Sequence, residues 1–149
     1  MVQVELFGVG DPRMEEAIGV RLAVFVDEQR IPLSEEIDDH DRDDPGAVHA
    51  VVRDPAGVVV ATGRFYSRDA QTAQIGRMAV TRGMRGTGAG HAVLRALMNE
   101  ARRRGFSAAS LDAQDHAIGF YAKAGFRAEG PTHLDCGIVH QPMRCAFEV

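Results

Sequence analysis

Several features that mark particular classes of protein are missing from this sequence. No apolar run approaches the roughly 20 residues of a membrane-spanning helix, and the N-terminus lacks the basic, then apolar, pattern of a signal peptide. Cysteine occurs only twice, at Cys136 and Cys145, in a spacing that matches no zinc or redox motif. We therefore expect a cytoplasmic protein without a metal site, in which both cysteines are small buried side chains.

A surplus of positive charge is also missing, and so are repeats and linkers. The formal net charge is −4, so neither nucleic acid nor an anionic membrane is an expected partner. Arg82, Arg85 and residues 102–104 are the basis for a nucleic-acid-binding alternative, but no aromatic side chains alternate with them. The length of 149 residues and the hydrophobic content of 45% predict a soluble protein with one domain over residues 1–149.

The pattern of apolar residues predicts a mixed α/β (α+β) protein. Strands are predicted at residues 2–7, 49–53, 58–66, 73–80 and 108–111, with two more between 126 and 147. Helices are predicted from Pro12 to near Gln29, at 88–104 and at 115–124. Three strands in succession, followed by a helix and another strand, indicate a mixed sheet with at least one right-handed parallel crossover.

An acidic segment runs from Glu35 to Asp44, where seven of ten residues are Asp or Glu. A calcium loop that begins at Asp39 needs Gly at its sixth position and Glu at its twelfth, but Asp44 and Ala50 stand there. Calcium binding is therefore rejected. Two interpretations remain, a surface that attracts a cationic amine and a solvated loop of like charges, and we prefer the solvated loop.

A glycine-rich turn joins a predicted strand to a predicted helix between Val80 and Gly90. Gly86, Gly88 and Gly90 let the backbone turn tightly and approach a ligand closely, and the free N–H groups of a new helix favour an anion. The turn therefore predicts a diphosphate site. The Gly-Lys-Ser/Thr of a P-loop is absent, and His91 stands where a dinucleotide fingerprint needs Gly or Ala. A turn that binds no ligand stays open as the alternative.

Two stretches of the sequence resemble the signatures of the GNAT family of N-acetyltransferases. Arg85-x-x-Gly88-x-Gly90 is similar to the acyl-CoA-binding motif, and residues 120–126 (Phe-Tyr-Ala-Lys-Ala-Gly-Phe) are similar to the second motif. Gln114 stands seven residues before Tyr121, where many members carry Asn. The pair Ala113-Gln114 is typical of the ElaA-like branch, which the chain also resembles at residues 24–29, Glu36, His49, Gly76-Arg77 and Gly137-Ile138-x-His140.

The resemblance implies both a fold and a donor. The fold is a mostly antiparallel mixed sheet of six to seven strands, flanked by helices and splayed between the fourth and fifth strands. The donor is acetyl-CoA as a co-substrate, with main-chain groups of Met78 and Val80 along its pantetheine arm and backbone amides of residues 85–90 at its pyrophosphate. The full set of donor-site residues implied in this way is Met78, Ala79, Val80, Arg85, Gly86, Thr87, Gly88, Ala89, Gly90, Gln114 and Tyr121.

The reaction implied by the resemblance is direct attack of an amine on a thioester within a ternary complex. Tyr121 is the candidate general acid, because a phenol with a pKa of about 10 stays protonated at neutral pH and can protonate a thiolate; a core aromatic beside Phe120 is the alternative. Glu28 and His140 are the candidate bases, with a solvated helix-end carboxylate and a hydrogen-bonded strand residue as their structural alternatives. A backbone N–H near Met78 is the expected oxyanion donor.

The acceptor side is the least determined part of the site. The candidate substrate-binding residues are Glu28, His49, Arg77 and His140. Val139, where relatives often have proline, and Cys136 depart from the branch pattern on this side. The acceptor is a small-molecule amine or a protein amine, and a homodimer is plausible although composition does not indicate one. The main alternative function is a catalytically inactive acyl-CoA-binding or regulatory module of the same fold.

Overall fold

The computed structural model describes residues 3–148. Its strands are β1 (Val4–Phe7), β2 (Val48–Arg53), β3 (Val59–Ser67), β4 (Thr72–Val80), β5 (Ala108–Gln114), β6 (Arg127–Ala128), β7 (His133–Asp135) and β8 (Ile138–Ala146). Its helices are α1 (Arg13–Arg21), the π-helix η1 (Leu22–Glu28), α2 (Leu33–Glu36), η2 (Asp39–Asp41), η3 (Arg82–Met84), α3 (Ala89–Arg103), η4 (Asp115–Ala117) and α4 (Ile118–Lys123). Apart from Val2, which lies outside the described residues, the predicted strands and helices are present, with ends that differ by a few residues.

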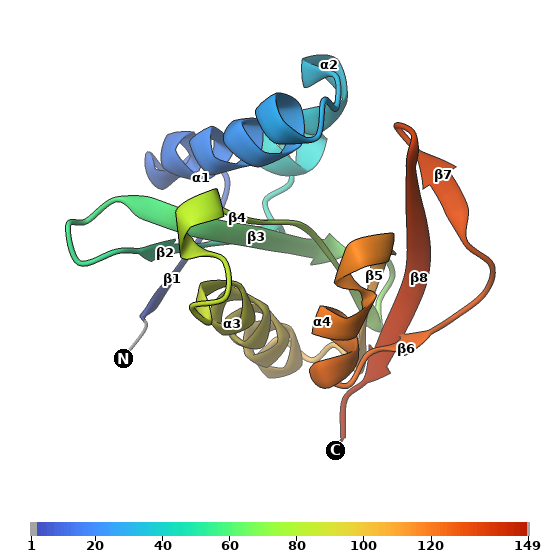
Figure 1. The fold of residues 1–149 in the computed structure, drawn as a ribbon. Coiled ribbons are helices and arrows are strands. Elements are labelled where there is room, and N and C mark those ends of the chain that lie inside the picture. The colour runs from blue at the N-terminus through green and yellow to red at the C-terminus, as the bar shows by residue number, and fades with distance from the viewer. Residues whose placement is uncertain (1–2, 149) are drawn as a thin grey trace.

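The strands form a single sheet in the order β1-β2-β3-β4-β5-β8-β6, with β7 paired to β8 (Figure 1). Every neighbouring pair is antiparallel except β4 and β5, which run parallel and are connected through α3. This arrangement confirms the predicted fold class. The sheet has eight strands rather than six to seven, because β6 and β7, which are only two and three residues long, both pair with β8.

The parallel pair at the centre of the sheet is joined over only part of its length. Residues 72–74 of β4 pair with residues 108–110 of β5, and the pairing stops there although the strands continue to Val80 and Gln114. Beyond that point β4 remains bonded to β3 and β5 remains bonded to β8. The two halves of the sheet therefore separate toward the carboxyl ends of β4 and β5, as the resemblance implied.

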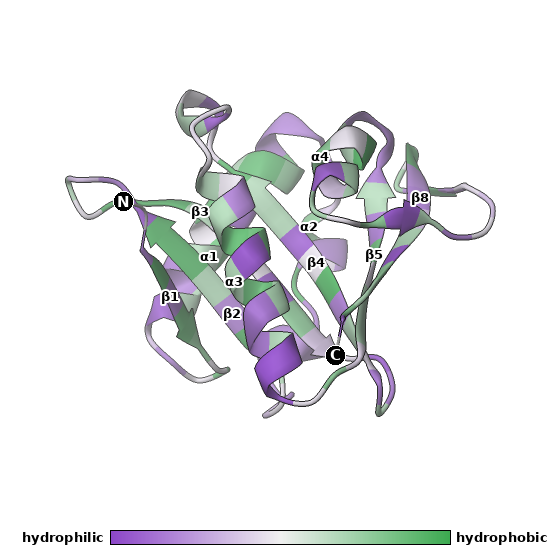
Figure 2. Ribbon diagram, turned by 90° about the horizontal axis from the view of Figure 1, so that it is seen from below, coloured by the Kyte–Doolittle hydropathy of each residue, from purple (hydrophilic) through white to green (hydrophobic). Residues whose placement is uncertain are grey.

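Helices cover both faces of the sheet around this gap. Helices α1 and α2 lie on one face and α3 on the other, with α4 beside β5 (Figure 1). Helix α3 buries Val93, Leu94, Leu97 and Ala101, which are all 0% exposed, because their three- and four-residue spacing places them on one side of the helix. Figure 2 shows this face of the molecule, with α3 lying across the strands. A second cluster of buried side chains lies under α1 and includes Met14, Ala17 and Val20.

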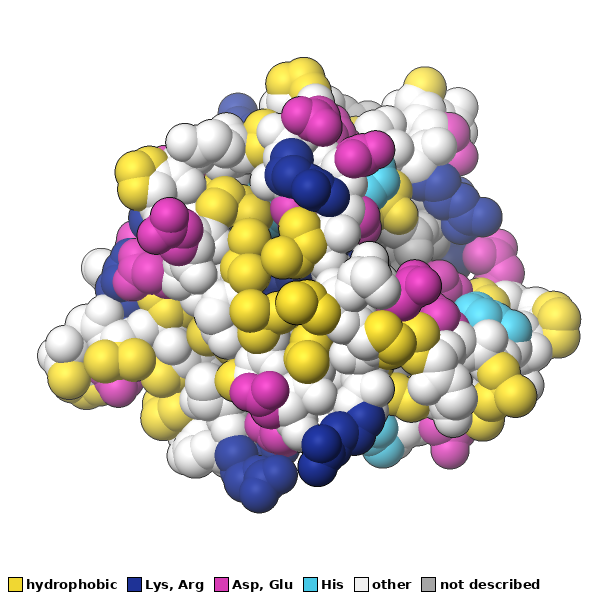
Figure 3. Space-filling view, turned by 90° about the horizontal axis from the view of Figure 1, so that it is seen from above, with side chains coloured by type: hydrophobic (Ala, Val, Ile, Leu, Met, Phe, Trp, Pro, Cys, Tyr) yellow, Lys and Arg dark blue, Asp and Glu magenta, His cyan; other side chains and the backbone are white. Residues whose placement is uncertain are grey.

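The surface on the α1 side mixes side chains of every kind. Figure 3 shows apolar, acidic and basic side chains interspersed over this face. Between residues 3 and 148, none of the helices has both the length and the apolar character needed to cross a membrane.

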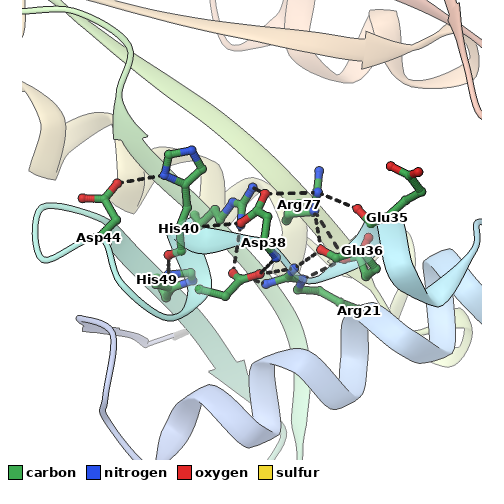
Figure 4. A network of polar contacts seen from close by, with 10 residues as sticks. Arg21, Glu35, Glu36, Asp38, His40, Asp44, His49 and Arg77 are labelled. Carbon is green, nitrogen blue, oxygen red and sulfur yellow. Dashed lines mark hydrogen bonds and ion pairs between the residues drawn. The ribbon is translucent and has the colours of Figure 1, made fainter.

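Part of the acidic segment is buried in the protein, so the prediction of a solvated loop is wrong for Glu36 and Asp41, although Glu35, Asp39 and Asp43 are exposed. The side chains of Glu36 and Asp41 are 3% and 0% exposed, and the side chain of Arg21 that joins them is 1% exposed. Figure 4 shows Arg21 and Glu36 pointing toward each other within this network. Arg21 Nε donates to Glu36 Oε1 at 2.8 Å, and its Nη1 donates to Asp41 Oδ1 at 2.6 Å. Arg64, which is also buried, donates from Nη1 to Asp38 Oδ1 at 2.6 Å and to Asp41 Oδ1 at 2.9 Å.

Burial and ion pairing act in opposite directions on these carboxyl groups. Burial raises the pKa of Glu36, and the hydrogen bond from Arg21 only partly opposes this effect. Burial also acts to raise the pKa of Asp41, but hydrogen bonds from Arg21 and the charge of Arg64 outweigh it and hold this pKa well below its usual value. Asp41 therefore remains ionised between two guanidinium groups and fixes the segment to α1 and β3.

Candidate active site

A cavity of about 570 Å³ occupies the gap between β4 and β5. This volume lies within the range of roughly 300–1,000 Å³ that is typical of small-molecule sites. Predicted site residues that line it are Glu28, Arg77, Met78, Ala79, Val80, Arg85, Gly90, Gln114, Tyr121 and His140. A more open hollow of about 630 Å³ adjoins it and shares Tyr66, Gln74, Leu111 and Asp112 as lining residues. The two hollows are therefore contiguous at the gap between β4 and β5.

Strand β4 carries a bulge where it lines the cavity. Arg64 pairs with Gly76 and Thr62 pairs with Ala79, so that Gly63 of β3 faces both Arg77 and Met78. Arg77 has a left-handed backbone with φ of 53°. A Cβ at position 63 would collide with the sulfur of Met78, which explains why glycine stands there. A bulge leaves one residue out of the hydrogen-bond ladder, so it exposes backbone groups at the place where the oxyanion donor is expected.

The glycine-rich turn after β4 has the geometry of an anion site. Gly86 and Gly88 have φ values of 80° and 90°, which side-chain-bearing residues rarely adopt, whereas a Cβ on Gly90 would lie 3.0 Å from Val80 Cγ2. The first hydrogen bond inside α3 runs from Ala92 N–H to Gly88 O, so the amides of residues 89–91 have no partner within the helix. Of the amides of residues 85–90 that were expected at a pyrophosphate, those of Arg85 and Thr87 instead donate to the carbonyls of Arg82 and Met84 at 3.5 and 3.4 Å, whereas those of Ala89 and Gly90 can face an anion. The side chain of Thr87 is not among these donors, because its hydroxyl donates to the carbonyl of Met84.

Arg85 and Glu28 form an ion pair at the edge of the cavity. Arg85 Nη2 donates to Glu28 Oε1 at 2.7 Å, and Arg85 Nε donates to the carbonyl of Val80 at 3.0 Å. A second guanidinium, that of Arg82, lies 3.6 Å from the same carboxylate oxygen. Positive charge from Arg85 and Arg82 thus already compensates the carboxylate of Glu28. To act as the base, Glu28 would have to exchange its hydrogen bond with Arg85 for one with the amine substrate.

Tyr121 belongs to the core and to the cavity at the same time. Its ring packs edge-on against Phe120, with centroids 5.1 Å apart, and against Phe126 at 6.1 Å. Among residues 3–148 its hydroxyl has no hydrogen-bond partner, and the residue lines the cavity. Burial raises the pKa of Tyr121 above its usual value, so the phenol keeps its proton well beyond neutral pH. Both sequence interpretations of this residue, as a core aromatic and as a proton donor facing the site, are therefore compatible.

His140 lies opposite the end of β5, where it pairs with Gln114. Its Nδ1 lies 2.8 Å from the carbonyl oxygen of Ile138, and since a carbonyl can only accept, Nδ1 carries the proton. In the neutral ring this leaves a lone pair on Nε2. His133 stacks on the ring with centroids 5.7 Å apart. Of the two candidate bases, His140 can accept a proton at Nε2 without first breaking an ion pair, whereas Glu28 must first leave Arg85.

Arg77 lines the cavity as expected, whereas His49 does not. The guanidinium of Arg77 donates to the carbonyls of Glu36 and Glu35 at 3.1 and 3.2 Å, so it holds the acidic segment against β4 while it lines the cavity. His49 does not line the cavity. It is 1% exposed, and its Nε2 contacts the carbonyl of His40 at 3.0 Å. The strand order explains this correction, because β3 and β4 stand between β2 and the gap.

The two cysteines also differ from expectation. Cys136 is exposed at the rim of the cavity and Cys145 is half-buried, so neither is a fully buried side chain. The pKa of each thiol is raised, by loss of hydration at both and also by the nearby carboxylate of Asp135 at Cys136, which disfavours a nucleophilic thiolate. Sequence reasoning gave no role to Gln29 or Asp112, which line the cavity. Within residues 3–148, no group of three or more His, Cys, Asp or Glu side chains is arranged to hold a metal ion.

The chain has a mostly antiparallel sheet that opens beside a glycine-rich helix start, the arrangement that the resemblance to acyl-CoA N-acyltransferases implied. The Acetyltransferase (GNAT) family profile matches residues 15–126. The chain is 35% identical, over 89% of its length and 92% of the relative, to YjcF of Bacillus subtilis, which is named as an uncharacterized N-acetyltransferase. The chain belongs to the GNAT acetyltransferase family.

Solved structures show the same fold. An acyl-CoA N-acyltransferase from Pseudomonas aeruginosa matches 98% of this chain with 100% of its own, at a TM-score of 0.85 and 26% identity. Escherichia coli ElaA matches 97% of this chain with 99% of its own, at a TM-score of 0.85 and 23% identity. The resemblance to the ElaA-like branch is therefore confirmed for the fold.

Proposed function

We propose that this protein transfers the acetyl group of acetyl-CoA to a primary amine by direct attack within a ternary complex. The observation that carries the proposal is that one cavity, in the gap between β4 and β5, is lined by the β4 bulge, Tyr121 and His140 together. An acyltransferase needs an oxyanion donor, an acid and a base around one carbonyl, and these three features supply them. Membership of the GNAT family supports this chemistry at the level of the family.

The residues around the gap suit the proposed donor. The free amides of residues 89–91 and the turn before them can bind a pyrophosphate, and Arg85 adds positive charge. The open backbone edge of β4 from Met78 to Val80 can pair with the amide groups of a pantetheine arm, since β5 has separated from it there. Acetyl-CoA, when bound, supplies the acetyl group as an activated thioester.

The proton transfers can be assigned to particular atoms. His140 Nε2 accepts the proton that the attacking amine loses as the new C–N bond forms. The exposed backbone near Met78 donates to the carbonyl oxygen as negative charge develops on it. Tyr121 Oη then gives its proton to the departing sulfur as the C–S bond breaks, which its protonated state allows. Glu28, whose carboxylate is paired with Arg85, is not assigned to proton abstraction.

The two adjoining hollows, which share lining residues, support a ternary complex. Carboxylates line the part of the main cavity that we assign to the amine acceptor. Glu35, Asp112 and Asp135 line the main cavity, and no ion pair among residues 3–148 includes any of the three. An amine panel for assay should therefore include polyamines, amino sugars, aminoglycosides and amino acids as well as lysine peptides and peptide N-termini.

The proposal is tested by thiol release from acetyl-CoA with that panel, after CoA binding has been measured by calorimetry. Tyr121→Phe and His140→Gln are expected to bind CoA like the wild type and to lower kcat, because each keeps the size of its side chain and loses its proton-transfer atom. Binding of CoA without transfer to any amine would instead support the alternative, a regulatory module of the same fold. Failure of the wild-type protein to bind CoA would contradict both.

A further inference from the structure

The end of the π-helix η1 contacts both sides of the open gap. Glu28, its last residue, pairs with Arg85 in the turn that follows β4. Gln29, the next residue, pairs with Gln114, which is the last residue of β5. Two consecutive residues of one helix end thus connect the two strands at the end where the backbone pairing between them has stopped.

The contact between Gln29 and Gln114 is reciprocal. Gln29 Nε2 donates to Gln114 Oε1 at 2.9 Å, and Gln114 Nε2 donates to Gln29 Oε1 at 2.8 Å. Each amide therefore gives one hydrogen bond and receives one, which fixes both side chains in a single arrangement. Both residues line the cavity. They are 85 positions apart in the sequence, so only the fold brings them together.

Gln29 is anchored on the β4 side of the gap. Its N–H bonds to Val24 O at 3.0 Å, the i to i−5 pattern of a π-helix, and Ile31 N–H closes the same helix end onto Phe25 O at 2.8 Å. Val24 and Phe25 are buried in the cluster under α1, together with Ala79 of β4. The helix end is therefore packed onto β4, and the amide pair joins it to Gln114 at the end of β5, whose other edge is bonded to β8.

We propose that Gln29 is a positioning residue of the donor site, which fixes the width of the gap at its open end by holding Gln114. This inference rests on the proposed function, because it concerns the pantetheine arm of a CoA donor between β4 and β5. The pair joins a helix end fixed to β4 with the end of β5, beyond the last backbone pairing of the two strands. Without Gln29, β8 still holds the end of β5, but the link to the helix end on β4 is lost, so the spacing of the two walls around a slender ligand is less firmly fixed.

Gln29→Met tests the inference, because methionine keeps the length of the side chain and removes both hydrogen bonds. We expect the Kd of CoA and the KM of acetyl-CoA to rise about tenfold, with little change in kcat at saturating donor or in the KM of the amine. Gln71→Met is the matched control, since Gln71 is exposed in the β3–β4 turn and does not line the cavity. Gln29→Glu, which keeps one hydrogen bond to Gln114, is a second variant expected to lie between the wild type and Gln29→Met.

A double-substitution cycle separates positioning from an independent contact. If Gln29 acts through Gln114, the variant Gln29→Met/Gln114→Met binds CoA no more weakly than Gln114→Met alone. Independent losses that multiply in the double variant would overturn the inference. The inference would also be overturned if Gln29→Met bound CoA as tightly as Gln71→Met. With a wild type that binds CoA and catalyses transfer, that result would leave the proposed function intact. No CoA binding by the wild type would overturn the proposed function and this inference with it.

Discussion

Arg85 Nη2 lies 2.7 Å from Glu28 Oε1, which links the first residue of the acyl-CoA signature to one of the two residues considered as the base. The side chains are 43% and 22% exposed, so the pair is partly screened by solvent. In this arrangement the carboxylate cancels part of the positive charge that a pyrophosphate would meet at the turn.

Glu28→Gln is therefore expected to tighten CoA binding. Removing the carboxylate leaves Arg85 uncompensated beside the anion site, and a partly exposed ion pair of this kind is worth about 0.2–1 kcal/mol, or up to roughly fivefold in Kd. Calorimetry at low and high salt checks this, because the gain should shrink as salt screens the charge. Glu15→Gln, on an exposed position of α1, makes the same change in net charge and should leave Kd unchanged. Weaker CoA binding by Glu28→Gln would show that the carboxylate organises the site instead.

Tyr121→Phe is expected to lower kcat by about 100-fold and to leave the Kd of CoA within a factor of about two. Because burial raises the pKa of Tyr121, the wild-type acid stays protonated past the usual phenol value, and kcat should not fall between about pH 8 and pH 10 through this group. A pH profile of kcat measures this directly. If kcat of the wild type fell between pH 8 and pH 10, and kcat of Tyr121→Phe did not, the phenol would ionise at a lower pH than its burial indicates.

Asp41→Asn is expected to destabilise the fold by about 3 kcal/mol, because it leaves Arg21 and Arg64 buried without their shared carboxylate. The pKa of Asp41 is lowered in the folded state, so the stability it contributes is present above its unfolded pKa of about 3.9 and is lost as pH falls toward the folded value. Urea unfolding at pH 7 and at pH 4 to 2 measures both effects. Asp43→Asn, on an exposed neighbour, is the control. Equal stability of the two variants at pH 7 would argue against a structural role for the network.

Gly63→Ala is expected to lower both stability and kcat/KM. The new Cβ would collide with the sulfur of Met78 and lie 2.9 Å from Val93 Cγ1, so the bulge of β4 or helix α3 must shift, at a cost of about 1–3 kcal/mol. Thermal unfolding and steady-state kinetics measure the two effects. Gly19→Ala is the matched control, because nothing lies within 4 Å of its Cβ position in α1. An active Gly63→Ala enzyme of normal stability would show that the bulge tolerates a side chain.

Features that depend on neighbouring residues could be predicted from the sequence. The apolar stripe of Val93, Leu94 and Leu97 determines which side of α3 is buried, since helical spacing fixes the face. Gly86 and Gly88 mark the turn after β4, because the left-handed conformations they adopt are unfavourable for other residues. These local signals, together with the second signature around Tyr121, were sufficient to indicate the family and the class of donor.

Features that depend on distant residues were decided only by the tertiary structure. The buried carboxylates of the acidic segment could not be recognised, because Arg21 and Arg64, which compensate them, stand outside the segment. His49 was misplaced because strand order, which no local pattern encodes, separates β2 from the gap. The contacts of Glu28 with Arg85 and of Gln29 with Gln114 span 57 and 85 positions. A charge or an amide has no partner until the chain has folded around it, so sequence determined the kind of site, and folding determined which side chains meet in it.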